Sequence, residues 1–423
     1  MRPWREIVEN SGARLFAGVA NLAVLFVTAR ALGPEGRGEI AVAVTWATLM
    51  ATIAGLSLGQ VSHRHIQDRR GDHWLPNLVG TMLVLAIGAS VAALLGAWAI
   101  SAAGMDALPN SLSRTVVLVA CVLVPFLVLD EYARNLLAAV GRMRSFAAAQ
   151  VVGNLLRIVL VVAAVGPLRS GVAGVVVAIV VSQWVIVGIE GCVLWQAAGG
   201  RIAFSKPQAT RFFGDSLRLH LNTVASFLLV QSNVLLLDHL ATPADVGNYQ
   251  LAQQLVLVVV LLPQSASMVL FGRIAERGPD AAWPDQKRLM AQVLAAVLAI
   301  GIIAYAVAPW FVQVFAGDEF YSAPAVLRCL LPALLGMSLA EMMAPQWFAR
   351  GIFLTSTVLT CITALASIVL NTYLIRRHGV MGAAWGTAIV YLAIVVVGQF
   401  AFAAWCESRY RLALTWPARP ARA

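Results

Sequence analysis

Apolar residues occur along this chain in long windows that few polar residues interrupt. A helix needs about 20 apolar residues to cross a bilayer, and about twelve such windows can be read. In the first half they lie near 15–32, 40–62, 77–104, 115–137, 146–166 and 171–196. In the second half they lie near 219–241, 249–272, 289–315, 323–347, 353–375 and 380–406. The pattern predicts an all-α polytopic membrane protein with about twelve transmembrane helices.

Polar residues within four of these windows recur at helical spacing and predict polar stripes. The first window carries Ser11, Arg14, Gly18, Asn21 and Thr28, and the second carries Thr45, Thr48 and Thr52. The seventh carries Asp215, Arg218, Asn222, Ser226 and Asn233, and the eighth opens with Asn248, Gln250, Gln253 and Gln254. Residues three, four or seven apart share one helix face. Such a face in a span avoids lipid and meets protein or water.

The two halves of the chain carry matching motifs at nearly the same offset. Residues 34–38, PEGRG, align with 243–247, PADVG, in the loop that is expected after the first helix of each half. Residues 171–178, GVAGVVVA, align with 379–386, GVMGAAWG, at the start of the sixth helix of each half. Arg142 aligns with Arg350 at the same offset as this second motif. Chance recurrence of Gly and Pro is the alternative to a repeat.

A repeat of six helices predicts two lobes with the same orientation and a central cavity between them, as in many transporters. The lobes are expected at residues 1–200 and 201–407, and residues 408–423 are expected to form a disordered cytoplasmic tail. Basic residues set the orientation. The outer side receives only Arg30, Arg37, Arg114, Arg169, Arg376 and Arg377, while Arg157 and Arg328 fall inside spans. The rest lie on the side of the N-terminus, so both termini are predicted to be cytoplasmic.

Composition agrees with a chain that is nearly all membrane. Hydrophobic residues make up 60% and charged residues 12%, against roughly 45–50% and 25% in soluble domains, and the mean hydropathy is +0.81. The net charge of +10 is explained by arginines beside anionic membrane lipids. Nucleic acid is therefore not an expected partner.

Motifs for enzyme chemistry are missing from the sequence. It has no GKS or GKT of a P-loop, no HExxH and no GxSxG. The cysteines lie singly in apolar windows, and a loop cluster of His63, His65, Asp68, Asp72 and His73 is more typical of a charged surface than of a metal site. We therefore expect no enzyme activity, no cofactor and no metal.

Three segments resemble one family of membrane proteins. They are ARALGPEGRGEIAVA at 29–43, DVGNYQLAQQLVLVVVLLP at 245–263 and HGVMGAAWGTAIVYL in the last helix. They look like the Wzx-type polysaccharide-export flippases of the multidrug/oligosaccharidyl-lipid/polysaccharide exporter superfamily. The resemblance implies two six-helix lobes in the bacterial inner membrane, with helices 1, 2, 7 and 8 lining a cavity. It also implies a polyprenyl-diphosphate-linked oligosaccharide as substrate, with a polysaccharide polymerase and glycosyltransferases as partners.

The polar stripes supply the predicted substrate-binding residues, namely Arg14, Asn21, Thr45, Thr48, Arg218, Asn222, Ser226 and Gln253. Arg14 and Arg218 would hold the diphosphate, because guanidinium groups match phosphate oxygens. Snorkelling of both arginines to lipid headgroups is the alternative. Asp238 and Glu341 are candidate sites for a coupling ion, and ion pairs between helices are the alternative there.

Two other functions compete with the flippase hypothesis. A cation-coupled drug antiporter would share the two-lobe fold, but such transporters are expected to carry acidic residues in the cavity. The first helix presents Arg14 and Asn21 instead, which favours an anionic substrate. A membrane scaffold for glycosyltransferases that transports nothing is the third hypothesis.

Overall fold

The computed structural model describes residues 2–59, 74–102 and 111–415, and every regular element in those ranges is a helix. The elements are α1 (Arg2–Gly55), α3 (Trp74–Ala102), α4 (Arg114–Ala139), α5 (Met143–Val165), α6 (Gly171–Ala197), α7 (Lys206–Leu240), α8 (Pro243–Arg277), α9 (Trp283–Phe315), α10 (Ala323–Leu330), α11 (Ala333–Ala349), α12 (Phe353–Val390), the π-helix η2 (Tyr391–Val396) and α13 (Val397–Thr415). The all-α prediction is confirmed. The histidine and aspartate cluster at 63–73 lies outside the described residues.

The described residues contain nine uninterrupted helical segments that are long and apolar enough to cross a membrane. Two of them have non-helical backbone at a glycine and are long enough to cross twice: α1, which breaks at Gly33, and the continuous α12–η2–α13 segment, which breaks at Gly379. In addition, α10 and α11 form one span that is bent by 47°. Seven of the nine segments count as one span each, the two long segments count as two spans each, and the bent pair adds one. The described part of the chain therefore contains twelve spans, as the sequence predicts.

The prediction that residues 34–38 and 243–247 lie in loops is wrong, because both segments form the first turns of helices. Pro34 follows the bend at Gly33, where φ is 65°, and Pro243 follows the N-cap Thr242. Thr242 and Asp245 form a reciprocal capping box. Proline is tolerated in a first turn, since no helical partner is needed there for its missing N–H. A Pro-Gly pattern in an apolar chain thus marks a helix start here.

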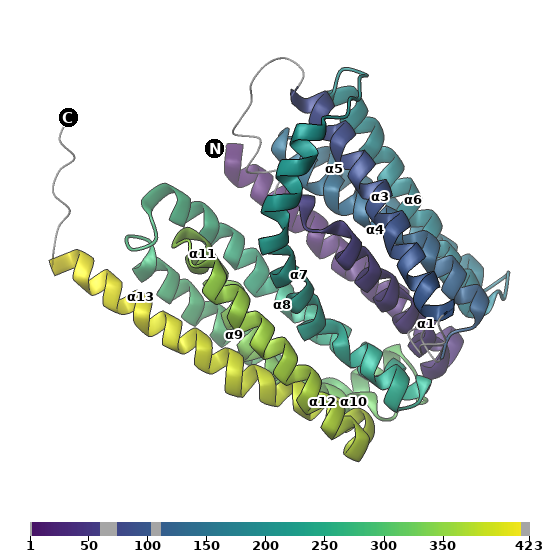
Figure 1. The fold of residues 1–423 in the computed structure, drawn as a ribbon. Helices are drawn as coiled ribbons and strands as arrows, with labels where there is room; N and C mark the ends of the chain where they lie inside the picture. Colours follow the sequence, from purple (N-terminus) through teal and green to yellow (C-terminus); the bar gives the residue numbers. More distant parts are fainter. Residues whose placement is uncertain (1, 60–73, 103–110, 416–423) are drawn as a thin grey trace.

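The second arm of α1 crosses the start of α8 in backbone contact (Figure 1). A Cβ on Gly38 would overlap the carbonyl oxygen of Pro243 and lie 2.9 Å from its carbonyl carbon. A Cβ on Gly247 would overlap the carbonyl oxygen of Pro34 and lie 2.8 Å from its carbonyl carbon. Small residues allow such close approach in membranes. The exchange of equivalent contacts is what a two-fold related pair of repeats produces, and we call this end of the protein the crossing end.

The second repeated motif also occupies equivalent places. Gly171 precedes the body of α6 with a φ of 61°, and Gly379 begins the second arm of α12 with a φ of 56°. Glycine adopts this left-handed region without the steric penalty of a side chain. The first glycine of the shared Gly-Val-x-Gly motif therefore allows the chain to change direction in the same way before the last span of each half.

The helices form two lobes that lie together at the crossing end and diverge towards the ends of the chain (Figure 1). One buried apolar cluster is drawn from residues 24–198, and a second is drawn mainly from residues 234–391. The two lobes and the two cores agree with the predicted architecture. A lobe boundary at 200/201 stays a prediction. Helix α13 continues to Thr415, past the expected start of the tail at 408, and residues 416–423 lie outside the described range.

Arg350 and Arg142 occupy equivalent turns of the two lobes but differ in their contacts. The Arg350 side chain is 7% exposed, and its Nη2 lies 2.7 Å from Oδ1 of Asp280. Its Nε donates to Gln346 Oε1 at 3.0 Å. Arg142 is exposed, and its Nη1 donates to the carbonyl of Val193 at 3.5 Å.

Arg350→Ala is expected to destabilise the C-terminal lobe by about 1–3 kcal/mol, because it leaves a charged and an amide partner unpaired. In detergent this should lower the midpoint of thermal unfolding by several degrees. Arg142→Ala is the matched control at the equivalent turn and should change the midpoint little. Equal midpoints for the two variants would contradict the assigned role of Arg350.

Candidate functional site

Arg157 of α5 joins three helices of the N-terminal lobe. Its Nη1 lies 3.4 Å from Oδ1 of Asn21 on α1. Its Nε donates to Oγ of Ser182 at 3.2 Å, and its Nη2 donates to Oε1 of Gln183 at 3.4 Å, both on α6. A guanidinium carries five N–H groups, so two remain without a partner among the described residues. Because Asn21 is exposed, a cation with spare donors lies beside a polar, accessible position.

Arg157 is not among the residues that the stripes of helices 1, 2, 7 and 8 predict. The signal that could have found it is a further stripe on α5, formed by Gln150, Asn154 and Arg157 at helical spacing. Only the packing of α5 against α1 and α6 shows which way this stripe points.

Two carboxylates lie deeper in the same lobe. Nε2 of Gln150 lies 2.8 Å from Oδ1 of Asp130 and 3.3 Å from Oε1 of Glu190. Glu190 is fully buried, and its Oε2 has no hydrogen-bond partner in the described ranges. Glu190 is therefore held in the interior of the lobe and Asp130 is partly exposed, whereas a guanidinium lies beside the exposed Asn21.

The other residues predicted on α1 contribute less than Asn21 to an accessible surface. Thr45 is buried. The Thr48 hydroxyl donates to the carbonyl of Val44 at 2.7 Å, within the same helix. Arg14 lies in α1, but its side chain is outside the described part of the structure. A role for these three residues in substrate binding stays a prediction.

The residues predicted on α7 and α8 lie in different surroundings. Gln253 is buried, and its Nε2 donates to the carbonyl of Val230 at 2.6 Å, which ties α8 to α7. Oδ1 of Asn222 is buried and has no partner among the described residues. Arg218 lies in α7 with its side chain outside the described part. Ser226 opens onto a cavity in the C-terminal lobe. The structure thus brings these residues to one pair of helices but not to one surface.

The cavity beside Ser226 has a volume of about 330 Å³ and is lined by residues of α7, α8, α11, α12, η2 and α13. Its polar lining includes Gln264, Glu341 and Thr363. Nε2 of Gln264 donates to Oε1 of Glu341 at 3.2 Å. A carboxylate among hydroxyl and amide groups offers oxygen ligands of the kind that hard cations prefer. Sequence spacing cannot show that Ser226 and Glu341, on α7 and α11, share this cavity.

Asp238 lies far along α7 from this cavity, at the crossing end. Its Oδ1 accepts a hydrogen bond from the backbone N–H of Ser111 at 3.2 Å and another from the Ser111 hydroxyl. Arg37, which the sequence places in an outer loop, is instead buried within α1. Its Nε donates to Oε1 of Gln250 on α8 at 3.1 Å. Asp238 and Arg37 thus both make contacts between the lobes at the crossing end.

A family model described as "Polysaccharide biosynthesis protein" matches residues 4–277, which include both arms of α1, all of α7 and all of α8. The chain belongs to this polysaccharide biosynthesis protein family. The resemblance carried by segments 29–43 and 245–263 is therefore confirmed. No curated protein matches the sequence.

Solved structures show the fold of this polysaccharide biosynthesis family member. An inward-facing multidrug resistance transporter of the MATE family, in the MOP superfamily, superposes with a TM-score of 0.72 at 18% identity, covering 95% of this chain and 96% of that one. The lipid II flippase MurJ, in an inward closed conformation, gives 0.75 at 12% identity, with 97% and 93% covered. An outward-facing MATE transporter gives 0.62 at 18% identity, with 97% and 96% covered. The protein is a multi-pass membrane protein with the two-lobe fold of these transporters.

Proposed function

We propose that this protein flips an undecaprenyl-diphosphate-linked oligosaccharide from the cytoplasmic to the periplasmic leaflet of the bacterial inner membrane. Translocation would proceed by alternating access, for surface polysaccharide synthesis. The observation that carries the proposal is Arg157, a guanidinium with unused donors beside the exposed Asn21 inside a span. Membership of a polysaccharide biosynthesis family and a fold shared with a lipid II flippase support it.

The chemistry of the substrate fits this cation. A diphosphate carries charge that must cross the hydrocarbon region, and an arginine in that region is itself costly unless it meets an anion or water. Guanidinium–phosphate contacts are charge-assisted and often bidentate. Arg157 lies about 21 Å along the axis of α5 from Met143, deep enough to hold the diphosphate within the membrane. Arg14 and Arg218, on α1 and α7, would receive it at the cytoplasmic entrance.

The lobes suggest the stage of the cycle. At the crossing end they are joined by the Gly38 and Gly247 contacts and by the Arg37–Gln250 hydrogen bond. The excess of basic residues on the N-terminal side favours cytoplasmic termini and an outer crossing end. The TM-scores with the inward-facing MATE transporter and with MurJ in its inward closed conformation are both higher than that with the outward-facing MATE transporter, which supports an inward-oriented state. Substrate would therefore enter from the cytoplasm.

The competing functions fit these observations less well. A cation antiporter is expected to present acidic groups to its substrate, and Glu341 does line the C-terminal cavity, but a guanidinium with unused donors lies beside the exposed Asn21 in the N-terminal lobe. A scaffold that transports nothing would have no use for a cation with unused donors within a span. A polysaccharide polymerase and glycosyltransferases would then be partners that use the flipped product or supply the substrate, and the protein itself would catalyse no reaction.

Deleting the gene tests the proposal. In a strain without a second flippase, surface polysaccharide should disappear while the lipid-linked intermediate accumulates in the cytoplasmic leaflet. Loss of the intermediate itself would instead support the scaffold, and altered drug susceptibility with normal polysaccharide would support the antiporter. Purified protein in proteoliposomes should then move a fluorescent polyprenyl-diphosphate oligosaccharide between leaflets.

Glu341→Gln should test whether the C-terminal cavity couples transport to an ion. The substitution keeps the shape and leaves an amide beside Gln264, but it removes the charge that a proton or Na⁺ would need. We expect transport to fall about tenfold, as for loss of one charged contact, and to lose its response to an imposed ion gradient. Glu276→Gln, at an exposed carboxylate of α8 outside this cavity, is the control. An unchanged gradient response in Glu341→Gln would exclude this carboxylate as the coupling site.

A further inference from the structure

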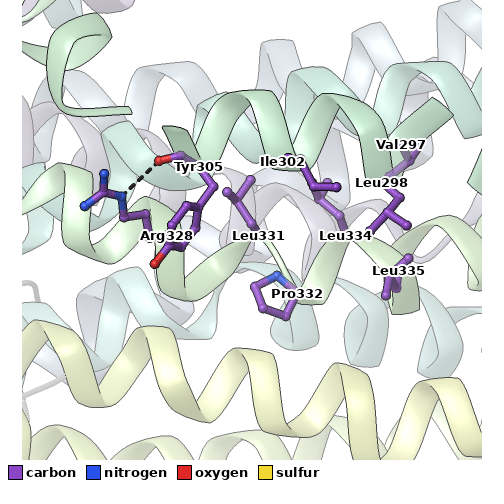
Figure 2. Close-up of a pocket in the computed structure, with 10 residues that line it drawn as sticks. Val297, Leu298, Ile302, Tyr305, Arg328, Leu331, Pro332, Leu334 and Leu335 are labelled. Atoms are coloured by element: carbon purple, nitrogen blue, oxygen red, sulfur yellow. Dashed lines mark hydrogen bonds between the residues drawn. The ribbon is translucent and has the colours of Figure 1, made fainter. Parts of the chain in front are cut away.

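A groove separate from the predicted substrate path lies between α9 and the bent α10–α11 pair (Figure 2). Its volume is about 370 Å³, within the range of ligand pockets. Apolar side chains line most of it, among them Leu298, Ile302 and Leu335. Arg328 and Tyr305 stand together at one end, and Val297, Leu298 and Leu335 stand at the other. The groove is therefore an apolar slot with a single charged end.

The sequence explains why a slot opens here. Pro332 has no N–H and cannot continue the helical hydrogen bonding of α10, which permits the 47° bend into α11. Gly301 of α9 faces the bend, and a Cβ placed there would have no atom nearer than 4.0 Å, the distance to Cδ1 of Leu334. Leu298 and Ile302 are exposed on the rim. In a span, such a rim faces the hydrocarbon chains of the bilayer.

The charged end is built to hold an anion. Nε of Arg328 donates to the carbonyl of Tyr305 at 3.0 Å, and its guanidinium lies 4.9 Å from the centre of the Tyr305 ring. Its two terminal nitrogens have no partner among the described residues. Arg328 lies about 8 Å along the helix from Ala323, the first residue of α10, and so near the membrane interface at the crossing end. A charged side chain at this depth is costly unless it is paired, and a guanidinium with free donors can form charge-assisted hydrogen bonds with a phosphate.

We propose that this groove binds one anionic phospholipid, with its phosphate on Arg328 and one acyl chain beside Gly301 and Leu335. The groove lining contains no acidic side chain, so a headgroup with net negative charge is favoured over a zwitterionic one. A polyprenyl substrate is disfavoured, because the polar stripes of the predicted path lie on α1, α7 and α8, whereas α9, α10 and α11 line the groove. The bound lipid fills the space at the break and stabilises the bend.

Lipid binding by the purified full-length protein tests this site independently of transport. Delipidated protein is titrated with phosphatidylglycerol, phosphatidylethanolamine or polyprenyl phosphate, and adducts are counted by native mass spectrometry. Wild-type protein should retain one phosphatidylglycerol more strongly than the other two lipids. Arg328→Gln should weaken phosphatidylglycerol binding about tenfold, as for loss of a charged hydrogen-bond donor, and abolish the preference over phosphatidylethanolamine.

Gly301→Leu should prevent binding of either phospholipid, since its side chain would fill the slot. Leu298→Trp, on the exposed rim, serves the same purpose if Gly301→Leu fails to fold. Two control variants are matched to the tests. Arg377→Gln removes a guanidinium 4.5 Å from the Tyr373 ring outside the groove, and Gly188→Leu adds a side chain at an exposed glycine of α6 whose Cβ would meet no atom within 4 Å.

Equal phosphatidylglycerol retention in the groove variants and their controls would overturn the proposal. Preferential retention of polyprenyl phosphate would overturn it as well, and would assign the groove to the substrate. Neither result depends on whether the protein flips an oligosaccharide, because the measurement contains no transport step.

Discussion

Replacing Gly247 with leucine is expected to impair the proposed transport strongly while leaving each lobe folded. A side chain at this position would overlap the backbone of Pro34, which cannot rotate away as a flexible side chain could. Overpacking of this kind costs about 1–3 kcal/mol. A shift of that size changes the ratio of two conformations about 5- to 150-fold, against the state in which the lobes meet at the crossing end. A transporter that cannot close one side cannot alternate.

Gly272 provides the control within the same helix, because a Cβ there would meet no atom within 4 Å. Gly272→Leu should transport normally in proteoliposomes, whereas Gly247→Leu should not. A cysteine at the buried Ala41, in a background without the native cysteines, should react with maleimide faster in Gly247→Leu. Gly38→Leu should behave like Gly247→Leu, because the two glycines make equivalent contacts. Normal transport and labelling in Gly247→Leu would show that this crossing is no gate.

The sequence predicts the helical spans and the repeat well, for a simple physical reason. Backbone groups in hydrocarbon must be bonded within a helix, so an apolar window of sufficient length has one main outcome. Helix ends are less predictable. Polar residues such as Asp215 and Arg218 end a hydropathy window but do not end a helix, and α7 begins as early as Lys206.

The bend at Pro332 shows a second limit of the sequence. Pro125, Pro263, Pro309 and Pro345 lie inside α4, α8, α9 and α11 without interrupting them. By contrast, Pro332 lies with Leu331 in the break between α10 and α11. A proline removes one hydrogen bond and crowds one carbonyl, but the packing around it decides whether the helix breaks. The groove at this break could therefore not be predicted from the apolar pattern.

The sequence predicts that polar residues of the first helix form part of the candidate site, but it does not predict which residues of other helices they contact. Helical spacing identifies Asn21 as a polar position on α1, and Asn21 is exposed. Its partner Arg157 comes from α5, and this contact requires knowledge of how α1, α5 and α6 pack together. Likewise, Asp238 and Glu341 are both polar residues in spans, yet one joins the lobes through Ser111 and the other lines a cavity. Spacing within one helix cannot separate these roles.

On the proposed function, Arg157→Gln is expected to reduce flipping of the lipid-linked oligosaccharide about 10- to 100-fold. A hydrogen bond to a charged group contributes about 1.5–3 kcal/mol, and each 1.4 kcal/mol is a factor of ten. Glutamine can still donate to Ser182 or Gln183, so the lobe should stay folded while the charge is lost. Arg157→Lys should be intermediate, because an ammonium keeps the charge but cannot form two parallel bonds to a phosphate.

The control is Arg142→Gln, which removes an exposed arginine of the same lobe whose Nη1 donates to the carbonyl of Val193. Flipping is measured in proteoliposomes, and thermal unfolding in detergent shows whether each variant is folded. If Arg157 only held α1 against α6, Arg157→Lys and Arg157→Gln should lose stability as well as transport. A loss of transport at unchanged stability, partly restored by lysine, requires the positive charge itself. Asp130 of α4 acts on the charge of Arg157 within the lobe, and the unused donors beside Asn21 would serve a negative group on the proposed substrate.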